Sequence, residues 1–122
     1  MPTTSVVIPT FNRERFIKDC VESVMCQTSQ PDEIIVVDDG SVDNTWEILK
    51  TVGFSDAVND KTPFRYIFQN NQGVSSARNA GIKASRFEYI ALLDSDDHWE
   101  KNKLEKQMAG LKNERFSFRL SH

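Results

Sequence analysis

The chain has 122 residues, of which 39% are hydrophobic, and this suffices for one domain that buries roughly two thirds of the surface its unfolded form exposes. Its formal net charge of −3 excludes the basic face that proteins binding nucleic acid usually present. No apolar run approaches the ~20 residues that span a bilayer, and the two cysteines fit neither a zinc site nor a Cys-x-x-Cys pair, so we expect a cytoplasmic protein that could work at the cytoplasmic face of a membrane.

The first predicted strand covers residues 5–9 and is followed by an amphipathic helix. Asn12 precedes this helix and is predicted to cap it, because asparagine is among the preferred capping residues. Apolar side chains then recur every three or four residues, which places them on one buried face. This predicted stripe consists of Phe16, Ile17, Cys20, Val21, Val24 and Met25.

The rest of the chain alternates strands and helices. Its apolar runs have strand length and are rich in β-branched and aromatic residues, and the segments between them carry apolar side chains at helical spacing. Such alternation predicts an α/β fold in which a mostly parallel sheet has helices on both faces. The predicted strands are residues 33–37, 64–68 and 87–93, and the predicted helices are residues 46–53, 74–84 and 101–112.

Polar clusters follow all four predicted strands. Taken alone, each cluster is typical of an ordinary turn or a helix cap. The carboxyl ends of parallel strands meet at one edge of a sheet, however, and ligands bind in the crevice outside that edge. The sequence therefore predicts a ligand site built from residues 9–13, 38–41, 70–73 and 94–97.

The last of these clusters ends the segment YIALLDSDD, residues 89–97, in which an apolar run stops at three carboxylates. Clustered carboxylates repel one another, so they are either spread over a solvated turn or held by a cation. A hard divalent cation would accept one or two of them as oxygen ligands and keep several waters. The residues by themselves leave both alternatives open.

Four ordered segments carry a resemblance to a known family. They read SVVIPTFNRERFIKDCVESVMCQT, EIIVVDDGSVDNT, NNQGVSSARNAGIKAS and YIALLDSDD. Together they resemble the N-terminal half of the family 2 nucleotide-sugar glycosyltransferases, over residues 4–112 of a single region that spans 1–122. The resemblance implies a Rossmann-like GT-A fold with strand order 3-2-1-4, and an enzyme that transfers a sugar from a UDP-sugar with inversion.

The resemblance also implies where the nucleotide binds. Pro9 and Thr10 would lie beside the base, and Asp39 would accept the imide hydrogen of uracil. A carboxylate suits this role because it can only accept hydrogen bonds. Arg78 would bind phosphate or fix the neighbouring carboxylates, although a solvated helix arginine is the alternative.

The acidic run resembles the Asp-x-Asp metal motif of the same family. Asp94 would face the ribose, and Asp96 would bind a Mg²⁺ or Mn²⁺ ion that bridges the diphosphate. Asp97 would support the acceptor side of the site. The acceptor itself, whether glycan, lipid or protein, is not indicated.

One part of the family pattern is absent from the sequence. The family's general base comes from a later acidic motif that we do not find, so we expect a truncated, donor-binding half whose catalytic residue is unknown. A catalytically inactive nucleotide-binding or interaction module is therefore an alternative. A phosphoacceptor receiver domain is a remote one, because it needs an acidic pair where this chain has Pro9 and Thr10.

The expected sheet would end in an uncovered strand. Residues 87–93 would lie at its edge, and an unpaired apolar edge favours pairing with another chain. Residues 113–122 match no family motif, and the alternation within 116–120 is compatible with a short strand that covers part of the edge. We therefore expect a homodimer formed through this edge.

Overall fold

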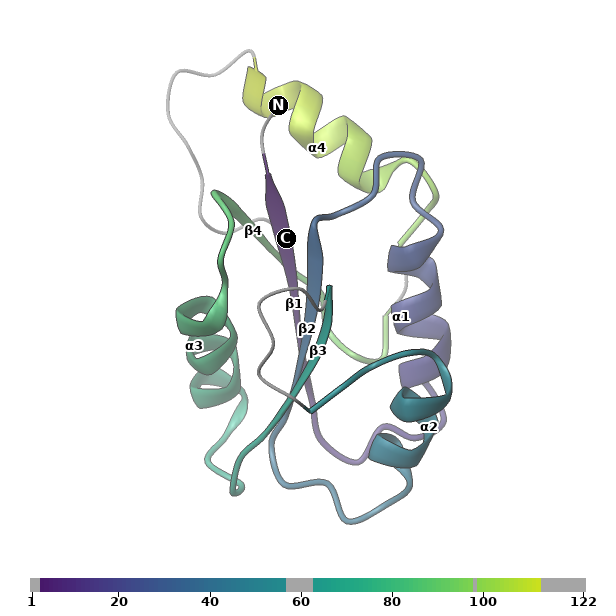
Figure 1. The fold of residues 1–122 in the computed structure, drawn as a ribbon, viewed down its shortest axis with the longest axis vertical. Coiled ribbons are helices and arrows are strands. Elements are labelled where there is room, and N and C mark those ends of the chain that lie inside the picture. Colours follow the sequence, from purple (N-terminus) through teal and green to yellow (C-terminus); the bar gives the residue numbers. More distant parts are fainter. Residues whose placement is uncertain (1–2, 57–62, 98, 113–122) are drawn as a thin grey trace.

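The fold is a parallel four-stranded sheet with helices on both faces (Figure 1). The computed structural model describes residues 3–56, 63–97 and 99–112. The strands lie in the order β3-β2-β1-β4, which confirms the predicted fold class and strand order. The elements are β1 (Thr4–Thr10), α1 (Ile17–Met25), β2 (Glu33–Asp38), α2 (Thr45–Thr51), β3 (Phe64–Phe68), α3 (Val74–Ala84), β4 (Tyr89–Leu92) and α4 (Lys103–Lys112).

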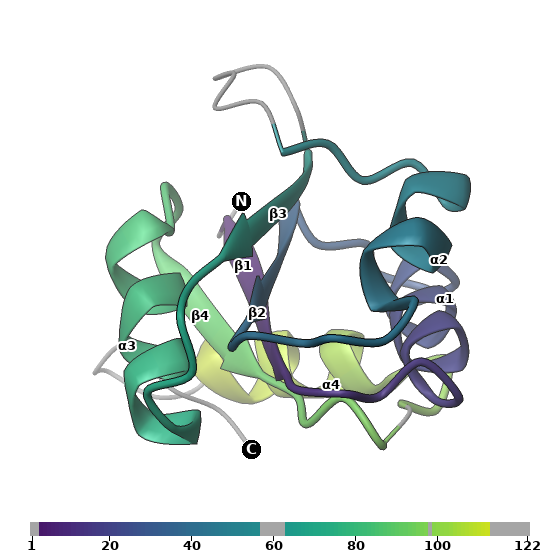
Figure 2. The ribbon, with the colours of Figure 1, turned by 90° about the horizontal axis from the view of Figure 1, so that it is seen from below.

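Two apolar layers enclose the sheet. Figure 2 places α3 on one face and α1 with α2 on the other. Side chains alternate along β1, so that Val6 and Ile8 pack in the α1 layer while Val7 packs in the α3 layer. Leu104 of α4 is buried in the same core cluster as the α1 side chains. The fold therefore has one sheet with a core on each side of it.

A glycine allows α3 to lie close to the sheet. A Cβ atom on Gly81 would stand 2.3 Å from Cγ1 of Val7, a distance that the packing could not accept. Ala77, one turn earlier on the same helix, is completely buried. Small side chains of α3 therefore face the sheet.

The beginning of α1 differs from the prediction. Asn12 does not cap the helix, because Phe16 is the N-cap residue and makes no side-chain capping bond. Asn12 instead has a positive φ of 52°, and its Oδ1 accepts a hydrogen bond from Val42 N at 2.9 Å. Phe16 is 49% exposed and does not belong to the buried stripe, since it precedes the first helical turn.

β3 and α3 have the predicted bounds, whereas several other boundaries shift by a few residues. β4 begins two residues later than predicted, α2 ends before Gly53, and α4 begins at Lys103. No helix in the described parts of the chain is long and apolar enough to cross a membrane. The predicted edge segment 116–120 lies outside the described residues.

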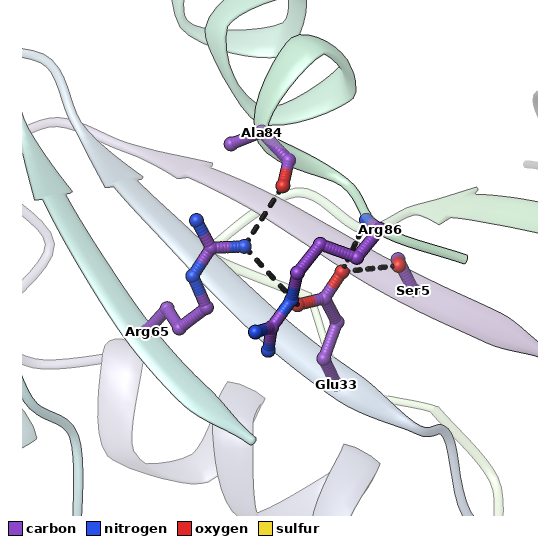
Figure 3. A network of polar contacts seen from close by, with 5 residues as sticks. All are labelled: Ser5, Glu33, Arg65, Ala84 and Arg86. Atoms are coloured by element: carbon purple, nitrogen blue, oxygen red, sulfur yellow. Dashed lines mark hydrogen bonds and ion pairs between the residues drawn. The ribbon is translucent and has the colours of Figure 1, made fainter. Parts of the chain in front are cut away.

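A network of hydrogen bonds and ion pairs surrounds one buried carboxylate at the amino end of the sheet (Figure 3). Glu33, the first residue of β2, is 1% exposed and accepts hydrogen bonds from Ser5 Oγ at 2.6 Å and Arg65 Nη1 at 3.2 Å. Arg86 adds two more, from its backbone N at 2.8 Å and its Nε at 3.1 Å. Arg65 Nη1 also donates to Ala84 O at the end of α3, at 2.8 Å. One carboxylate thus joins β1, β2, β3 and the α3–β4 connection.

Candidate functional site

A cavity of about 420 Å³ opens at the carboxyl ends of the strands, at the opposite end of the sheet from Glu33. We call it the carboxyl-end cavity. Its walls come from the segments after β1, β2 and β4 and from the beginning of α3. It is lined by Pro9, Thr10, Phe11, Arg13, Asp39, Asn71, Gly73, Val74, Ala77, Arg78, Asp94, Ser95 and Asp96.

Strand alternation explains why Asp39 lines this cavity and Asp38 does not. Asp38 continues the β2 side chains that face α1 and α2, and its Oδ2 accepts a hydrogen bond from the buried Tyr66 hydroxyl. Its Oδ1 accepts from Ser41 N at 2.8 Å. Asp39 points to the α3 side, where the cavity lies. The first aspartate therefore holds the loop and the second faces the cavity.

Three donors hold the carboxylate of Asp39, which is 4% exposed. Oδ1 accepts hydrogen bonds from Gln69 Nε2 and Gln72 N, both at 2.8 Å, and Oδ2 accepts one from Gly73 N at 2.9 Å. Burial alone would raise the pKa of Asp39, but these hydrogen bonds outweigh it and hold the pKa below its ordinary value. Asp39 is therefore a fixed, ionised acceptor.

Gly40 lets the loops after β2 and β3 meet. Its φ is +91°, and a Cβ atom there would stand 3.0 Å from Asn71 N. Asn71 Nδ2 donates to Asp39 O at 3.0 Å, which closes the contact between the two loops. The backbone around Asp39 is thus set by its neighbours before any ligand arrives.

Arg78 and Asp94 form an ion pair across the cavity. Arg78 Nη2 lies 3.2 Å from Asp94 Oδ1, and the two side chains are 35% and 56% exposed. Asp94 comes two residues after the end of β4 and Arg78 comes from α3, so the pair links the sheet to the helix beside it. Asp96 is exposed and lines the same cavity.

Two residues that line the cavity carry a buried polar atom without a partner. Within the described residues, Thr10 Oγ1 and Arg78 Nε are buried and make no hydrogen bond. Thr10 pairs with Asp38 in the sheet, so its side chain lies on the α1 and α2 side and not in the cavity. A ligand in the cavity can therefore reach the exposed part of the Arg78 side chain but not the Thr10 hydroxyl.

Asp97 lies elsewhere than the other predicted site residues. It lines a second cavity of about 290 Å³, together with Arg78, Asp94, Trp99 and Lys103. We call this space the Asp97 cavity. Since Arg78 and Asp94 line both cavities, their ion pair separates the two spaces.

The described residues contain no group of three or more His, Cys, Asp or Glu side chains that could hold a metal ion. The predicted metal ligand Asp96 nevertheless fits a different arrangement. Mg²⁺ and Mn²⁺ accept one or two carboxylates and complete their coordination with water and phosphate oxygens. Asp96, exposed in the cavity near Asp94, offers such a partial ligand set.

Several cavity residues were not singled out from the sequence. Gln69 and the backbone N–H groups of Gln72 and Gly73 hold Asp39, and Phe11 and Arg13 line the wall. The polar run at 70–73 indicated a site without naming a role. Backbone donors leave no mark on a sequence, because every residue except proline has one.

Comparisons with known proteins agree with the geometry. A sequence model described as Glycosyl transferase family 2 matches residues 5–119. The chain is 43% identical over 98 residues to the uncharacterised glycosyltransferase EpsJ of Bacillus subtilis, covering 80% of this chain and 27% of that protein. It is 38% identical over 107 residues to TuaG of the same organism, a putative teichuronic acid biosynthesis glycosyltransferase, covering 88% and 41%.

The fold matches solved structures of S. aureus TarS. The complex of TarS 1–349 with UDP-GlcNAc superposes with a TM-score of 0.78 at 28% identity, covering 91% of this chain and 31% of that one. The complex of TarS 1–349 with UDP gives a TM-score of 0.77 at the same identity. A family match along most of the sequence, close relatives and a shared fold lead to one conclusion: the chain belongs to glycosyl transferase family 2.

Proposed function

We propose that the carboxyl-end cavity binds the UDP part of a UDP-sugar, in an enzyme that transfers the sugar to a hydroxyl group of a glycan, lipid or protein. The observation that carries this proposal is the ionised carboxylate of Asp39, which three protein donors hold in a cavity that Arg78 and Asp96 also line. The UDP and UDP-GlcNAc complexes of the structurally similar TarS support it.

Asp39 is proposed to recognise uracil. A carboxylate has about four acceptor positions, and three of those on Asp39 are filled by protein donors. The fourth is on Oδ2, where the imide N–H of uracil can donate. Pro9 and Thr10 would lie beside the base. Cytosine has no hydrogen at that ring position, so it would leave the acceptor unpaired.

Arg78 is proposed to bind the diphosphate. A guanidinium binds phosphate oxygens with two parallel hydrogen bonds, and the Nε of Arg78 has no partner in the described residues. Its ion pair with Asp94 would keep the guanidinium in place, while Asp94 faces the ribose. We assign Asp97 to the acceptor side, because it lines the neighbouring cavity.

Asp96 is proposed to contribute the protein's ligand to a Mg²⁺ or Mn²⁺ ion. When bound, the ion would neutralise charge on the departing UDP. An inverting transfer also needs a base that deprotonates the acceptor hydroxyl during a single displacement at the anomeric carbon. We assign that base to none of the described carboxylates. The chain covers 27% of EpsJ and 41% of TuaG, so the whole enzyme's activity remains a proposal.

Base recognition is tested by calorimetry with UDP and CDP. If Asp39 accepts from the uracil imide, CDP should bind more weakly by ~1–3 kcal/mol, because a buried acceptor stays unpaired. Equal affinities for the two nucleotides would contradict the assignment of Asp39.

The metal assignment is tested by titrating UDP and UMP with and without Mn²⁺. Asp96→Ala should abolish the effect of Mn²⁺ on UDP binding and leave UMP binding nearly unchanged, because the ion's main partner is the diphosphate. Equal weakening of both nucleotides would mean that Asp96 has a structural role. An assay of UDP-sugar hydrolysis on the same samples separates an active domain from a nucleotide-binding module without activity.

The open edge of β4 leads to a proposal about assembly. Within the described residues no strand lies beyond β4, whereas Ser55 pairs with the outer side of β3. We propose that two copies of the chain pair through the β4 edge. We also propose that the protein works at the cytoplasmic face of a membrane. Light scattering across a concentration series should give a dimer mass. A monomer mass at high micromolar concentration would contradict the pairing.

A further inference from the structure

The segment that carries the acidic run leaves the sheet abruptly. Its last bond to β1 runs from Leu93 N to Val7 O, at 3.1 Å. Asp94 and Asp96 follow as exposed side chains, so their positions depend on how the backbone between residues 94 and 104 is held. In Figure 1 this segment runs from the end of β4 along α1 to α4.

Side chains of α1 hold the first part of that segment. Cys20 Sγ lies 3.6 Å from Asp94 O, and Ser23 Oγ accepts a hydrogen bond from Trp99 N at 3.0 Å. Ser23 Oγ also donates to Cys20 O at 2.7 Å, which fixes the hydroxyl on the helix. These contacts hold α1 beside Asp94, at the start of the acidic run, and beside Trp99, just after its end.

Gln27, just after α1, holds the second part. Its side chain is buried, with the residue only 3% exposed. Nε2 donates to Ser23 O at 3.0 Å and to Glu100 O at 2.6 Å, and Oε1 accepts from Leu104 N at 2.9 Å. One amide thus bonds the end of α1, the segment after the acidic run and the first turn of α4.

We propose that Gln27 is a positioning residue for the acidic run, acting through the backbone at Glu100 and Leu104. The inference rests on the proposed function, in which Asp94 and Asp96 face the nucleotide and its metal ion.

Two variants isolate this role. Gln27→Met keeps the length of the side chain but removes its three hydrogen bonds. Leu104 N then loses its Gln27 acceptor, and Glu100 O keeps only the bond from Lys103 N at 3.1 Å. Gln30→Met is the matched control, because Gln30 is exposed and its Nε2 bonds Met25 O at 3.1 Å, at the same helix end, without reaching the segment after β4.

The experiment measures the binding of UMP, and of UDP with Mn²⁺, to the full chain by calorimetry. Mutation of a residue that orients metal ligands typically lowers the metal affinity by 10–100-fold. We therefore expect Gln27→Met to weaken UDP binding in Mn²⁺ by about tenfold and to change UMP binding by less than about twofold. Gln30→Met should change neither. A Gln27→Met protein that keeps full UDP affinity in Mn²⁺, or that loses UMP and UDP affinity equally, would overturn the proposal.

Hydrogen exchange of the free chain supplies a readout that needs no nucleotide. Asp97 N donates to Asp94 O at 3.0 Å, so its protection reports the turn of the acidic run. Gln27→Met should speed amide exchange at Asp97 and Leu104, while the amides of β2 stay protected. Unchanged exchange at Asp97 and Leu104 would overturn the inference. If the parent chain failed to bind UDP, the proposed function would fail while this readout still decided the role of Gln27. Should Gln27→Met fail to fold, Gln27→Glu keeps an acceptor for Leu104 N but removes the donor to Glu100 O, so exchange at Asp97 should still speed up and UDP affinity in Mn²⁺ should still fall. Unchanged exchange and affinity in that variant would overturn the proposal.

Discussion

Glu33 at the amino end of the sheet and Asp94 at the carboxyl end are both carboxylates paired with arginines, yet their surroundings differ. The Glu33 side chain is 0% exposed and accepts four hydrogen bonds, from Ser5, Arg65 and Arg86. The Asp94 side chain is 56% exposed and has one ion pair, with a guanidinium at 3.2 Å.

The difference separates polar groups that hold the fold from polar groups that wait for a ligand. At the amino end, the carboxylate has filled about all of its acceptor positions. At the carboxyl end, three hydrogen bonds leave one acceptor position of Asp39 open, and Asp94 and Asp96 are exposed in the cavity. A ligand or ion that binds there can still pair with these groups. The two ends should therefore respond to mutation in opposite ways.

The largest effect is expected at Glu33. Glu33→Gln should lower the free energy of unfolding by about 3–5 kcal/mol, because it removes the buried charge that Arg65 and Arg86 pair with and turns an NH₂ group toward their donors. Asp96→Asn, at an exposed carboxylate of the other end, should change it by less than about 0.5 kcal/mol. Urea denaturation of both variants measures the contrast. Equal losses would show that the two ends do not differ in this way.

A smaller loss is expected at Asp39, which belongs to the site but is buried. Asp39→Asn replaces one acceptor oxygen by an NH₂ group that faces protein donors, so stability should fall by ~1–3 kcal/mol. The preference for UDP over CDP should disappear in the same variant. A variant that kept its nucleotide preference would assign base recognition to another residue.

The sequence predicted features that neighbouring residues determine better than features that depend on contacts between distant parts of the chain. The bounds of α3 were predicted as 74–84 because local spacing and flanking residues determine them. Asn12 was wrongly assigned as a cap, since its partner Val42 is thirty residues away. A site at the carboxyl end was predicted because polar clusters follow all four strands, whose carboxyl ends meet at one edge of a parallel sheet. The position of Asp97 in the second cavity follows from an irregular turn that has no period.

Acid should weaken the fold chiefly through the satisfied carboxylates. Burial alone would raise the pKa of Glu33, but the hydrogen bonds from Ser5, Arg86 and Arg65 outweigh it and lower the pKa from its ordinary 4.5. A lowered pKa means that the unfolded chain binds more protons, so this stability is complete above about pH 4.5 and is lost as the pH falls further. Unfolding followed from pH 7 to pH 3 should show a flatter decline for Glu33→Gln. An unchanged slope would show that Glu33 does not contribute to the loss of stability in acid.

The smallest effect concerns the two thiols. Burial, and then the charges of Asp97, Asp96 and Asp94, raises the pKa of Cys20 to about 12, whereas Cys26 is exposed. Iodoacetamide at pH 8 should therefore label Cys26 and spare Cys20, because only the thiolate reacts. Mass spectrometry of tryptic peptides gives the ratio. Equal labelling would indicate that the face of α1 beside the acidic run is open to solvent.

The contrast between the two ends is tested most directly by measuring how much UDP with Mn²⁺ stabilises Glu33→Gln and Asp96→Asn against urea. A ligand that binds only the folded state adds RT ln(1 + [L]/Kd) to the free energy of unfolding, so one titration reports stability and affinity together. Glu33→Gln should start from a much lower stability and gain the same increment as the parent chain. Asp96→Asn should keep the parent stability, since its side chain is exposed, and should lose most of the increment, since the metal loses its carboxylate ligand. An increment that survives in Asp96→Asn, or that disappears in Glu33→Gln while the protein is still folded, would contradict the division of roles between the two ends of the sheet.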